Sequence, residues 1–163
     1  LGLSQRTYIE KVLQRFSMEG CKNGECPMSK GDRLHKGKCP RNALERRNME
    51  KMPYARLVGS LMYAQVCTRP DISFAVNMLS RYQSDAGEEH WIAGKKVLRY
   101  LRSTRDHMLV YKRIEDEELR VECYADASYK QDMDDLKSTS GYIFMLAGGA
   151  ISWKTNKQGL IAT

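Results

Sequence analysis

The sequence lacks any long apolar run, since no stretch approaches the ~20 consecutive apolar residues that a membrane-spanning helix needs. Residues 1–15 carry charges among helically spaced apolar residues and lack the apolar segment of a secretory signal. No internal repeat or low-complexity segment is present either. From these absences we expect no membrane partner and an intracellular location, in the cytoplasm.

Cysteines are few and odd in number, which disfavours a framework of disulfides in a chain without an export signal. The chain has five of them: Cys21, Cys26, Cys39, Cys67 and Cys123. A C-x4-C-x8-H-x3-C pattern that is similar to a zinc knuckle is formed by Cys21, Cys26, His35 and Cys39. Because zinc sites more often use tighter C-x2-C spacing, a flexible cysteine-bearing linker is the favoured alternative.

The composition of the 163 residues, 42% hydrophobic and 29% charged, is typical of one globular chain. Its net charge of +7 is unevenly placed, because residues 1–113 hold 22 Lys and Arg against 11 Asp and Glu, whereas residues 114–163 hold 5 against 9. A basic body with an acidic end suits a part that binds polyanions joined to a part that binds cations. A basic surface that is merely solvated is the alternative.

Apolar residues spaced three and four apart predict helices at about 4–20, 54–65, 70–82 and 88–103. Pro53 and Pro70 suit first helical turns, where proline is tolerated. The faces expected to be buried consist of Ile9, Val12, Leu13 and Phe16; Leu57, Val58 and Leu61; Ile72, Ala75, Val76 and Leu79; and Trp91, Gly94, Leu98 and Leu101. Residues 20–52 lose this periodicity and are predicted to be a long connection between lobes.

After Met108 the pattern changes to that of strands. Short segments rich in branched and aromatic residues predict strands at 108–113, 119–128, 139–147 and 150–155. Gly148-Gly149 indicates a tight turn between the last two. The last three strands are therefore expected to form an antiparallel meander.

Two groups of motifs carry a family resemblance along nearly the whole chain. One group consists of Val121-Glu122-Cys123-Tyr124-Ala125-Asp126-Ala127-Ser128, Lys137-Ser138-Thr139-Ser140-Gly141-Tyr142 and Gly148-Gly149-Ala150-Ile151-Ser152-Trp153-Lys154. It resembles the opening strands of the ribonuclease H of copia-type (Pseudoviridae-like) retrotransposons. The other group resembles the segment after the polymerase palm in their Pol polyprotein, and it consists of Leu3-Ser4-Gln5, Tyr8-Ile9-Glu10-Lys11-Val12-Leu13, Val58-Gly59-Ser60-Leu61-Met62-Tyr63, Thr68-Arg69-Pro70-Asp71-Ile72 and Val97-Leu98-Arg99-Tyr100-Leu101.

The resemblance implies a fragment of a reverse transcriptase and ribonuclease H polyprotein. Ribonuclease H cuts the RNA strand of an RNA–DNA hybrid with two divalent cations, for which Mg²⁺ is suited, held by clustered carboxylates. Asp126 matches the first of these carboxylates, and the resemblance places the others after Thr163. We therefore expect Mg²⁺ in the complete parent enzyme, and neither cofactor nor activity in the fragment alone. The alternative for Asp126 is a polar residue at a strand end.

The residues after Asp126 depart from the family pattern, which has a further acid, an aromatic residue and a small pair. This chain reads Ser128-Tyr129-Lys130-Gln131 instead. Because a lysine close to a metal site opposes cation binding, a decayed genomic copy is an alternative. The acidic run of Asp132, Asp134 and Asp135 is predicted to be a solvated loop rather than a substitute metal site.

Basic residues on two predicted helices are the candidates for phosphate contacts along a hybrid: Lys11, Arg15, Lys95, Lys96, Arg99 and Arg102. Such contacts are independent of base sequence and sensitive to salt. An ordinary charged helix face is the alternative. Trp91 shares its face with Leu98 and Leu101 and is predicted to be core rather than a stacking platform.

Arg99-Tyr100-Leu101-Arg102 also fits the short RxLR pattern of secreted effectors from oomycete pathogens. That pattern belongs near the start of a secreted chain, whereas these residues lie within a predicted helix. An effector-like protein is therefore the minor alternative.

Together these observations predict an α+β chain that begins at leucine as a piece of a longer polypeptide. Residues 1–112 are expected to form a helical region like a polymerase thumb or connection, with 20–52 as its linker, and residues 113–163 the first three antiparallel strands of an incomplete ribonuclease H-like sheet. The expected partners are an RNA–DNA hybrid or other nucleic acid, bound weakly, and the rest of the Pol polyprotein. A non-catalytic nucleic-acid-binding or interaction module is the second hypothesis. Because an open edge and an absent covering helix destabilise a sheet, we expect partial disorder in residues 113–163.

Overall fold

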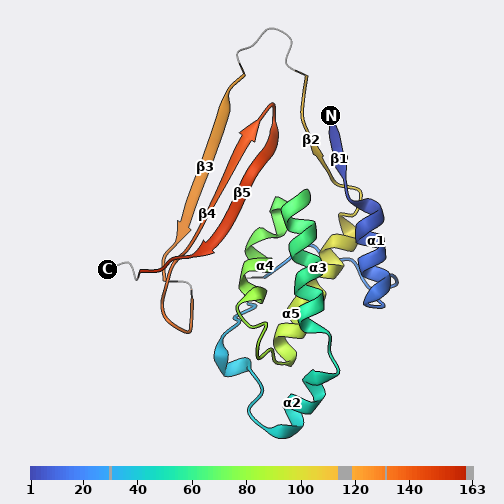
Figure 1. Cartoon of the computed structure of the whole chain (residues 1–163), viewed down its shortest axis with the longest axis vertical. Coiled ribbons are helices and arrows are strands. Elements are labelled where there is room, and N and C mark those ends of the chain that lie inside the picture. Colours follow the sequence, from blue (N-terminus) through green and yellow to red (C-terminus); the bar gives the residue numbers. More distant parts are fainter. Residues whose placement is uncertain (30, 114–118, 131, 161–163) are drawn as a thin grey trace.

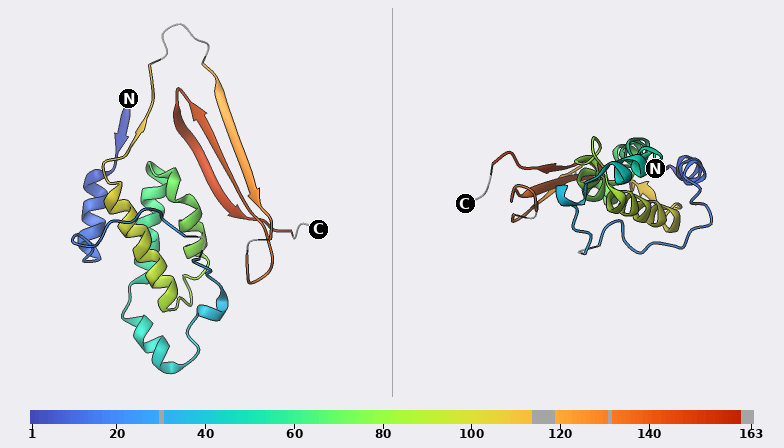
Figure 2. Two further views of the ribbon diagram at one scale, coloured as in Figure 1. Left: turned by 180° about the vertical axis from the view of Figure 1, so that it is seen from behind. Right: turned by 90° about the horizontal axis from the view of Figure 1, so that it is seen from below.

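The computed structural model describes residues 1–29, 31–113, 119–130 and 132–160 and is an α+β chain. Its elements follow in the order β1 (Gly2–Ser4), α1 (Arg6–Arg15), the 3-10 turn η1 (Lys36–Lys38), α2 (Ala43–Glu50), α3 (Tyr54–Cys67), the 3-10 turn η2 (Pro70–Ile72), α4 (Ser73–Ser80), α5 (Glu88–Ser103), β2 (Met108–Val110), β3 (Val121–Ser128), β4 (Thr139–Leu146) and β5 (Gly149–Lys157). The helices gather into one unit, and strands β3 to β5 lie along one side of it (Figure 1, Figure 2).

The apolar faces predicted for α1, α3, α4 and α5 meet in one core. Among the described residues, this core runs from Ile9 to Leu101, so it is built by the helical part of the chain. Trp91 is a partial exception to the prediction, since it is only half-buried and packs at the core's edge with its ring 6.3 Å from that of Phe16. None of the helices in the described part of the chain has the length and apolar character that crossing a bilayer requires.

Helix α1 is shorter than predicted and ends at Arg15 rather than near Gly20. Ser17 adopts a left-handed backbone (φ 53°), and the N–H of Met18 donates to the carbonyl of Leu13 at 2.9 Å. This arrangement closes the helix because it satisfies a carbonyl that has no partner further along the helix. At the other end, the Ser4 hydroxyl accepts from the N–H of Arg6 at 3.2 Å, beside the helix start.

Residues 20–52, which were predicted to be a long connection without apolar periodicity, contain η1 and helix α2. Helix α2 begins at a polar cap, in which Asn42 Oδ1 accepts from the N–H of Glu45 at 2.9 Å and the Glu45 carboxylate accepts from the N–H of Arg41 at 2.7 Å. No residue of α2 is buried. A helix without a buried face needs no apolar periodicity, which explains why the sequence pattern did not indicate it.

The segment Thr68-Arg69-Pro70-Asp71 joins α3 to α4 and holds a buried arginine. Arg69, only 2% exposed, donates to both carboxylate oxygens of Asp71, at 3.0 and 2.7 Å, and to the carbonyl oxygen of Thr104 at 3.2 Å. Its guanidinium also lies 5.5 Å from the centre of the Tyr100 ring. This arginine therefore ties the start of α4 to the end of α5.

Strands β3, β4 and β5 form the antiparallel meander that was predicted, with boundaries shifted by two residues or fewer. Asp126 on β3 pairs with Gly141 on β4, and Gly141 pairs with Thr155 on β5. The turn between β4 and β5 uses left-handed residues at Ala147 (φ 51°) and Gly148 (φ 77°), which agrees with the predicted glycine turn.

The covering of this sheet differs from expectation, since β5 packs against the helical unit. Trp153 Nε1 donates to the carbonyl of Gln65 on α3 at 3.0 Å, and Asn77 Nδ2 on α4 donates to the carbonyl of Thr155 at 2.9 Å. Thr155 Oγ1 and Ser73 Oγ lie 3.0 Å apart. The partial disorder expected for residues 113–163 stays a prediction, and residues 114–118, 131 and 161–163 of that range lie outside the described residues.

The strand predicted at 108–113 does not belong to the sheet of β3, β4 and β5. Its observed part, β2, forms an antiparallel pair with β1, which the sequence analysis did not identify. Strand β1 is three exposed residues long, so neither length nor alternation distinguishes it from a loop. Beyond β2, the N–H of Lys112 donates to the carbonyl of Ala147 at 2.8 Å and so connects this pair to the larger sheet.

Two helical glycines offer a matched test of the packing between α3 and α5. A Cβ on Gly94 would lie 2.6 Å from Cδ2 of Leu57, which is fully buried, whereas a Cβ on Gly59 would meet nothing within 4 Å. We expect Gly94→Val to lower the free energy of unfolding by about 1–3 kcal/mol through overpacking. Gly59→Ala should raise it by about 0.5–1 kcal/mol, because alanine has the higher helix propensity. Urea denaturation followed by circular dichroism measures both, and equal stability of the two variants would contradict the observed packing.

Candidate nucleic-acid interface and sheet carboxylate

Asp126 lies near the end of β3 with an exposed side chain, and its Oδ1 accepts from the N–H of Ala127 at 2.8 Å. By register it shares a sheet face with Gly141 and Thr155, and Thr155 contacts α4. Asp126 thus lines a hollow of about 480 Å³ between the sheet and the start of α4. The hollow also has aromatic walls, which are formed by Phe74, Tyr124, Tyr142 and Trp153.

The donor set around Asp126 is small for a metal centre. Within the described ranges, no three His, Cys, Asp or Glu side chains come together as ligands for a metal ion. Two Mg²⁺ ions need several carboxylate oxygens in addition to water, so Asp126 by itself does not fit such a pair. Lys130, which the sequence placed near this position, has its Nζ 5.0 Å from the centre of the Tyr129 ring. The described residues therefore offer one candidate carboxylate, Asp126, and no group of three or more metal-ligand side chains.

The zinc-knuckle pattern is not assembled in the described part of the chain, because its cysteines and His35 do not gather as a ligand group. His35 Nδ1 instead accepts from the N–H of Gly37 at 3.1 Å, at the start of η1. Cys26 Sγ lies 3.8 Å from Ser29 Oγ. This geometry fits the alternative of a cysteine-bearing linker.

The two basic candidates on α1 lie on the outer side of the helical unit. Lys11 is exposed, and Arg15 Nη1 donates to Ser60 Oγ on α3 at 3.3 Å. Tyr8, also on α1, donates its hydroxyl hydrogen to the carbonyl of Ser60 at 3.1 Å. Helix α1 therefore places these cations beside α3.

Of the four basic candidates on α5, Lys96 and Arg102 bind the 20–52 linker through their side chains. Lys96 forms an ion pair with Asp32, and Lys95 lies 5.9 Å from the centre of the Trp91 ring. Arg102 donates to the carbonyl of Glu19 at 2.7 Å, to the carbonyl of Cys21, and to Asn23 Oδ1 at 2.8 Å. Arg99 keeps an exposed side chain, while its backbone carbonyl accepts from the N–H of Gly24 at 3.2 Å. The structure therefore divides the six candidates into two groups with different surroundings.

Helix α3 has a second apolar face, which the sequence analysis missed. This outer face consists of exposed Ala55, Gly59, Met62, Tyr63, Val66 and Cys67, and it also carries the exposed cation Arg56. Tyr63 is 56% exposed and Val66 is 66% exposed, and the ring of Tyr8 lies 4.7 Å from that of Tyr63. The signal was present, because residues 54–67 are apolar on both sides of the helix, but only the side that continues the core was considered.

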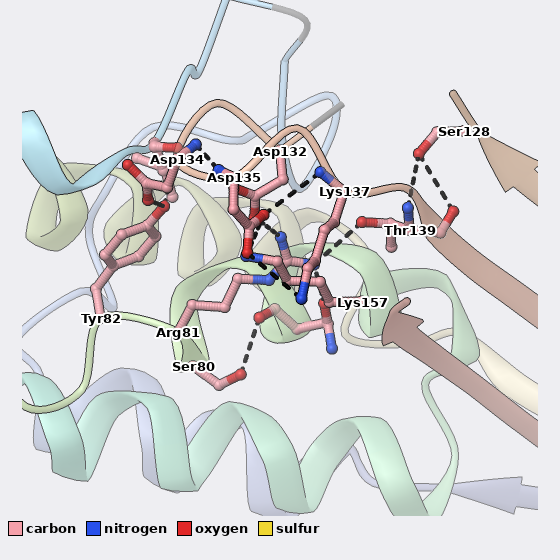
Figure 3. A network of polar contacts seen from close by, with 12 residues as sticks. Ser80, Arg81, Tyr82, Ser128, Asp132, Asp134, Asp135, Lys137, Thr139 and Lys157 are labelled. Carbon is pink, nitrogen blue, oxygen red and sulfur yellow. Dashed lines mark hydrogen bonds and ion pairs between the residues drawn. The ribbon is translucent and has the colours of Figure 1, made fainter. Parts of the chain in front are cut away.

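The acidic run after β3 corrects another prediction, since it is not a solvated loop. Asp132 is only 2% exposed, and its Oδ2 lies 2.6 Å from Arg81 Nη1 and 2.8 Å from Lys157 Nζ (Figure 3). Asp134 accepts from the N–H of Lys36 at 2.8 Å and from the Tyr82 hydroxyl at 3.0 Å. The partners come from distant segments, so local sequence could not indicate this burial.

Comparison with known proteins gives relatives from mobile genetic elements. The chain is 45% identical over 162 residues to the retrovirus-related Pol polyprotein from transposon TNT 1-94 of Nicotiana tabacum, which covers 99% of this chain and 12% of that protein. It is 40% identical over 161 residues to the Pol polyprotein from transposon RE2 of Arabidopsis thaliana, which covers 97% of this chain and 10% of that protein. The class is therefore that of retrotransposon polyproteins. Within this class, the chain belongs to the copia-type Pol polyproteins, and it spans about a tenth of the length of the two named here.

A further relative bears on the minor alternative. The secreted RxLR effector protein 161 of Plasmopara viticola is 44% identical over 114 residues, which covers 70% of this chain and 79% of that protein. The four-residue pattern itself lies inside α5, where Leu101 is 1% exposed and Arg102 holds the linker. Because the Pol polyproteins match nearly the whole chain, the effector interpretation is not favoured. No family model and no solved structure matches the chain.

Proposed function

We propose that this chain is the segment of a copia-type Pol polyprotein in which a reverse-transcriptase region joins its ribonuclease H. In this proposal the helical unit holds an RNA–DNA hybrid, and strands β3 to β5 begin the ribonuclease H-like sheet. The observation that supports the proposal is the outer face of α3, an exposed and mainly apolar strip that carries Arg56 and lies beside the cations of α1.

The shape and chemistry of this outer face suit the minor groove of a hybrid. The minor groove of an A-form helix is wide and shallow, and it presents sugar and base edges between two lines of phosphates. Gly59, with nothing within 4 Å of a Cβ built on it, permits close approach of the helix backbone, and Tyr63 and Met62 supply apolar contact. Lys11 and Arg15 then meet phosphates in a manner independent of base sequence.

The sheet contributes the carboxylate of Asp126 to the proposed hybrid-cleaving site. When bound, Mg²⁺ supplies charge stabilisation for phosphodiester hydrolysis, and Asp126 is the residue of this chain that would hold it. Completion of the site requires carboxylates from the rest of the Pol polyprotein, which is the protein partner that we propose. Among the described residues, β3 pairs on one edge with β4, so its other edge is available to a further strand.

The alternative proposal, a non-catalytic nucleic-acid-binding module, rests on the same outer face of α3. The two proposals differ in whether carboxylates from elsewhere in the polyprotein join Asp126. Sequencing the transcript beyond Thr163, with mass spectrometry of the native C-terminus, discriminates between them.

Binding of a labelled RNA–DNA hybrid, measured by fluorescence anisotropy over a series of salt concentrations, tests the helical interface. We expect Gly59→Leu to weaken binding about tenfold, equivalent to about 1.4 kcal/mol, because its side chain holds the helix away from the groove. Lys11→Gln should reduce the slope of log affinity against log salt concentration by about one, as expected for the loss of one phosphate contact. Arg47→Gln, on the exposed surface of α2, serves as the charge-matched control. Unchanged affinity of Gly59→Leu would remove the outer face of α3 from the interface.

A further inference from the structure

The contact between the sheet and the helical unit is mainly polar. The buried apolar core stops at Leu101, and Ala150 is the one buried apolar residue that the described strands contribute. Between β5 and the helices the structure has hydrogen bonds, such as that from Trp153 Nε1 to Gln65, and the hollow that Asp126 lines. An interface of this kind has little hydrophobic area to determine one orientation, so its directional contacts set the geometry.

Asp132, on the loop between β3 and β4, uses both of its carboxylate oxygens in this interface. Its Oδ2 takes the charged hydrogen bonds from Arg81 at the end of α4 and from Lys157 at the end of β5. Its Oδ1 accepts the backbone N–H groups of Asp134 at 2.8 Å and of Asp135 at 3.2 Å. One carboxylate therefore joins the helical unit, the last strand of the sheet and the loop between β3 and β4, as Figure 3 shows.

The partners of Asp132 are themselves held in place. Arg81 Nη2 donates to Asn77 Oδ1 at 2.6 Å and to Thr139 Oγ1, at the start of β4, at 3.1 Å. Lys157 also pairs with Asp135 at 2.8 Å, so positive and negative groups alternate. Burial by itself would raise the pKa of Asp132, but the hydrogen bonds from Lys157 and from the two backbone N–H groups outweigh it and lower this pKa to about 2. The carboxylate is therefore charged at neutral pH.

We propose that Asp132 is a positioning residue that fixes the orientation of the sheet, and with it Asp126, relative to the helical unit. The role in orientation is independent of the proposed function. A fixed orientation would also fix the distance between Asp126 and a hybrid bound on the outer face of α3. This consequence rests on the proposed function.

Substitution by asparagine tests this role with little change in shape. Asp132→Asn replaces one of the two carboxylate oxygens, which accept hydrogen bonds, with an amide NH2 group, which donates them. That donor must point either at Arg81 and Lys157 or at the two backbone N–H groups, and both arrangements oppose donor to donor. The two cations also lose their shared counter-charge in a buried place. We expect the loop to leave its site and the sheet to take up more than one orientation.

The native cysteines provide the measurement. Cys67 at the end of α3 and Cys123 on β3 are both exposed, so they report on the helical unit and on the sheet. After replacement of the other cysteines by serine, spin labels at these two positions give a distance distribution by pulsed electron paramagnetic resonance. We expect a single narrow distribution for the parent and a broadened or double one for Asp132→Asn, with the thermal melting of the helices retained. Asp85→Asn, which removes a carboxylate that is 48% exposed and lies 4.0 Å from Arg46 Nη1, outside this network, is the matched control and should keep the narrow distribution.

A second variant covers the case in which Asp132→Asn loses the sheet altogether. Lys157→Met removes one partner at the partly exposed end of β5 and keeps the pair of Arg81 and Asp132, so it should broaden the distribution to a smaller extent. If both variants fold and both give distributions as narrow as the parent's, the proposal is overturned. If Asp132→Asn does not fold, a distribution as narrow as the parent's in Lys157→Met overturns it. Because the distances are measured without nucleic acid, a failure of hybrid binding leaves this result unaffected and counts only against the proposed function.

Discussion

Replacement of Arg69 by methionine is expected to lower the free energy of unfolding by about 3 kcal/mol. Removal of one partner of a buried ion pair leaves the other without compensation, at a cost of about 3–5 kcal/mol. The lower end of this energy range applies to Arg69→Met, because the Asp71 side chain is 33% exposed and partly solvated. The variant also loses the donors to Thr104 that tie the end of α5 to the start of α4.

The pH dependence of unfolding provides a second measure of the same pair. Burial tends to raise the pKa of Asp71, but the hydrogen bonds and charge of Arg69 outweigh it and leave this pKa below its usual value. A carboxyl group with a lowered folded-state pKa stabilises the fold above its unfolded pKa of about 4, and this contribution is lost as the pH falls through the folded value. We expect the decrease in the free energy of unfolding at low pH to be smaller in Arg69→Met than in the parent.

Arg105→Met is the control for this prediction, because its side chain is 41% exposed and its nitrogen lies 3.7 Å from Asp106. Such a surface pair contributes about 0–1 kcal/mol. Urea denaturation at several pH values measures both variants. Equal stability of Arg69→Met and Arg105→Met would show that the Arg69 network contributes no more than a surface contact.

In the complete Pol polyprotein, Asp126→Asn is expected to lower Mg²⁺-dependent cleavage of the RNA strand of a hybrid by about a thousandfold or more. In the proposed function, the substitution removes a charged oxygen ligand from a site whose metal ions would stabilise the transition state by several kcal/mol. Hybrid binding by the outer face of α3 should be unchanged, because that face lies on a different element. Gel analysis of a labelled RNA strand, at matched enzyme and Mg²⁺ concentrations, measures the effect.

Glu122→Gln is the matched control for Asp126→Asn. Glu122 is an exposed carboxylate on the same strand, and by its spacing it lies on the same sheet face. It accepts from the Tyr124 hydroxyl at 3.2 Å and lies near the opposite end of β3 from Asp126. Equal loss of cleavage in both variants would indicate damage to the sheet, and full cleavage by Asp126→Asn would exclude Asp126 as a metal ligand.

The sequence by itself determined the elements whose signals are local. Apolar residues three and four apart identified the four core helices, because each helix buries one face and the periodicity records that face. The glycine turn and the short branched segments likewise predicted the meander of β3 to β5. The ordered motifs along the chain indicated its family, which the relatives confirm.

Tertiary structure decided the features that depend on contacts between distant segments. Helix α2 buries no residue, so no apolar pattern marked it, and its polar cap alone specifies its start. Arg102 looked like a free cation on a helix, but the linker carbonyls it binds lie about eighty residues earlier. Asp132 looked like a loop residue because the charges that allow its burial, on Arg81 and Lys157, become its neighbours only when the sheet meets α4. Local pattern records periodicity and turn chemistry, whereas the burial of a charge depends on which partners the fold brings to it.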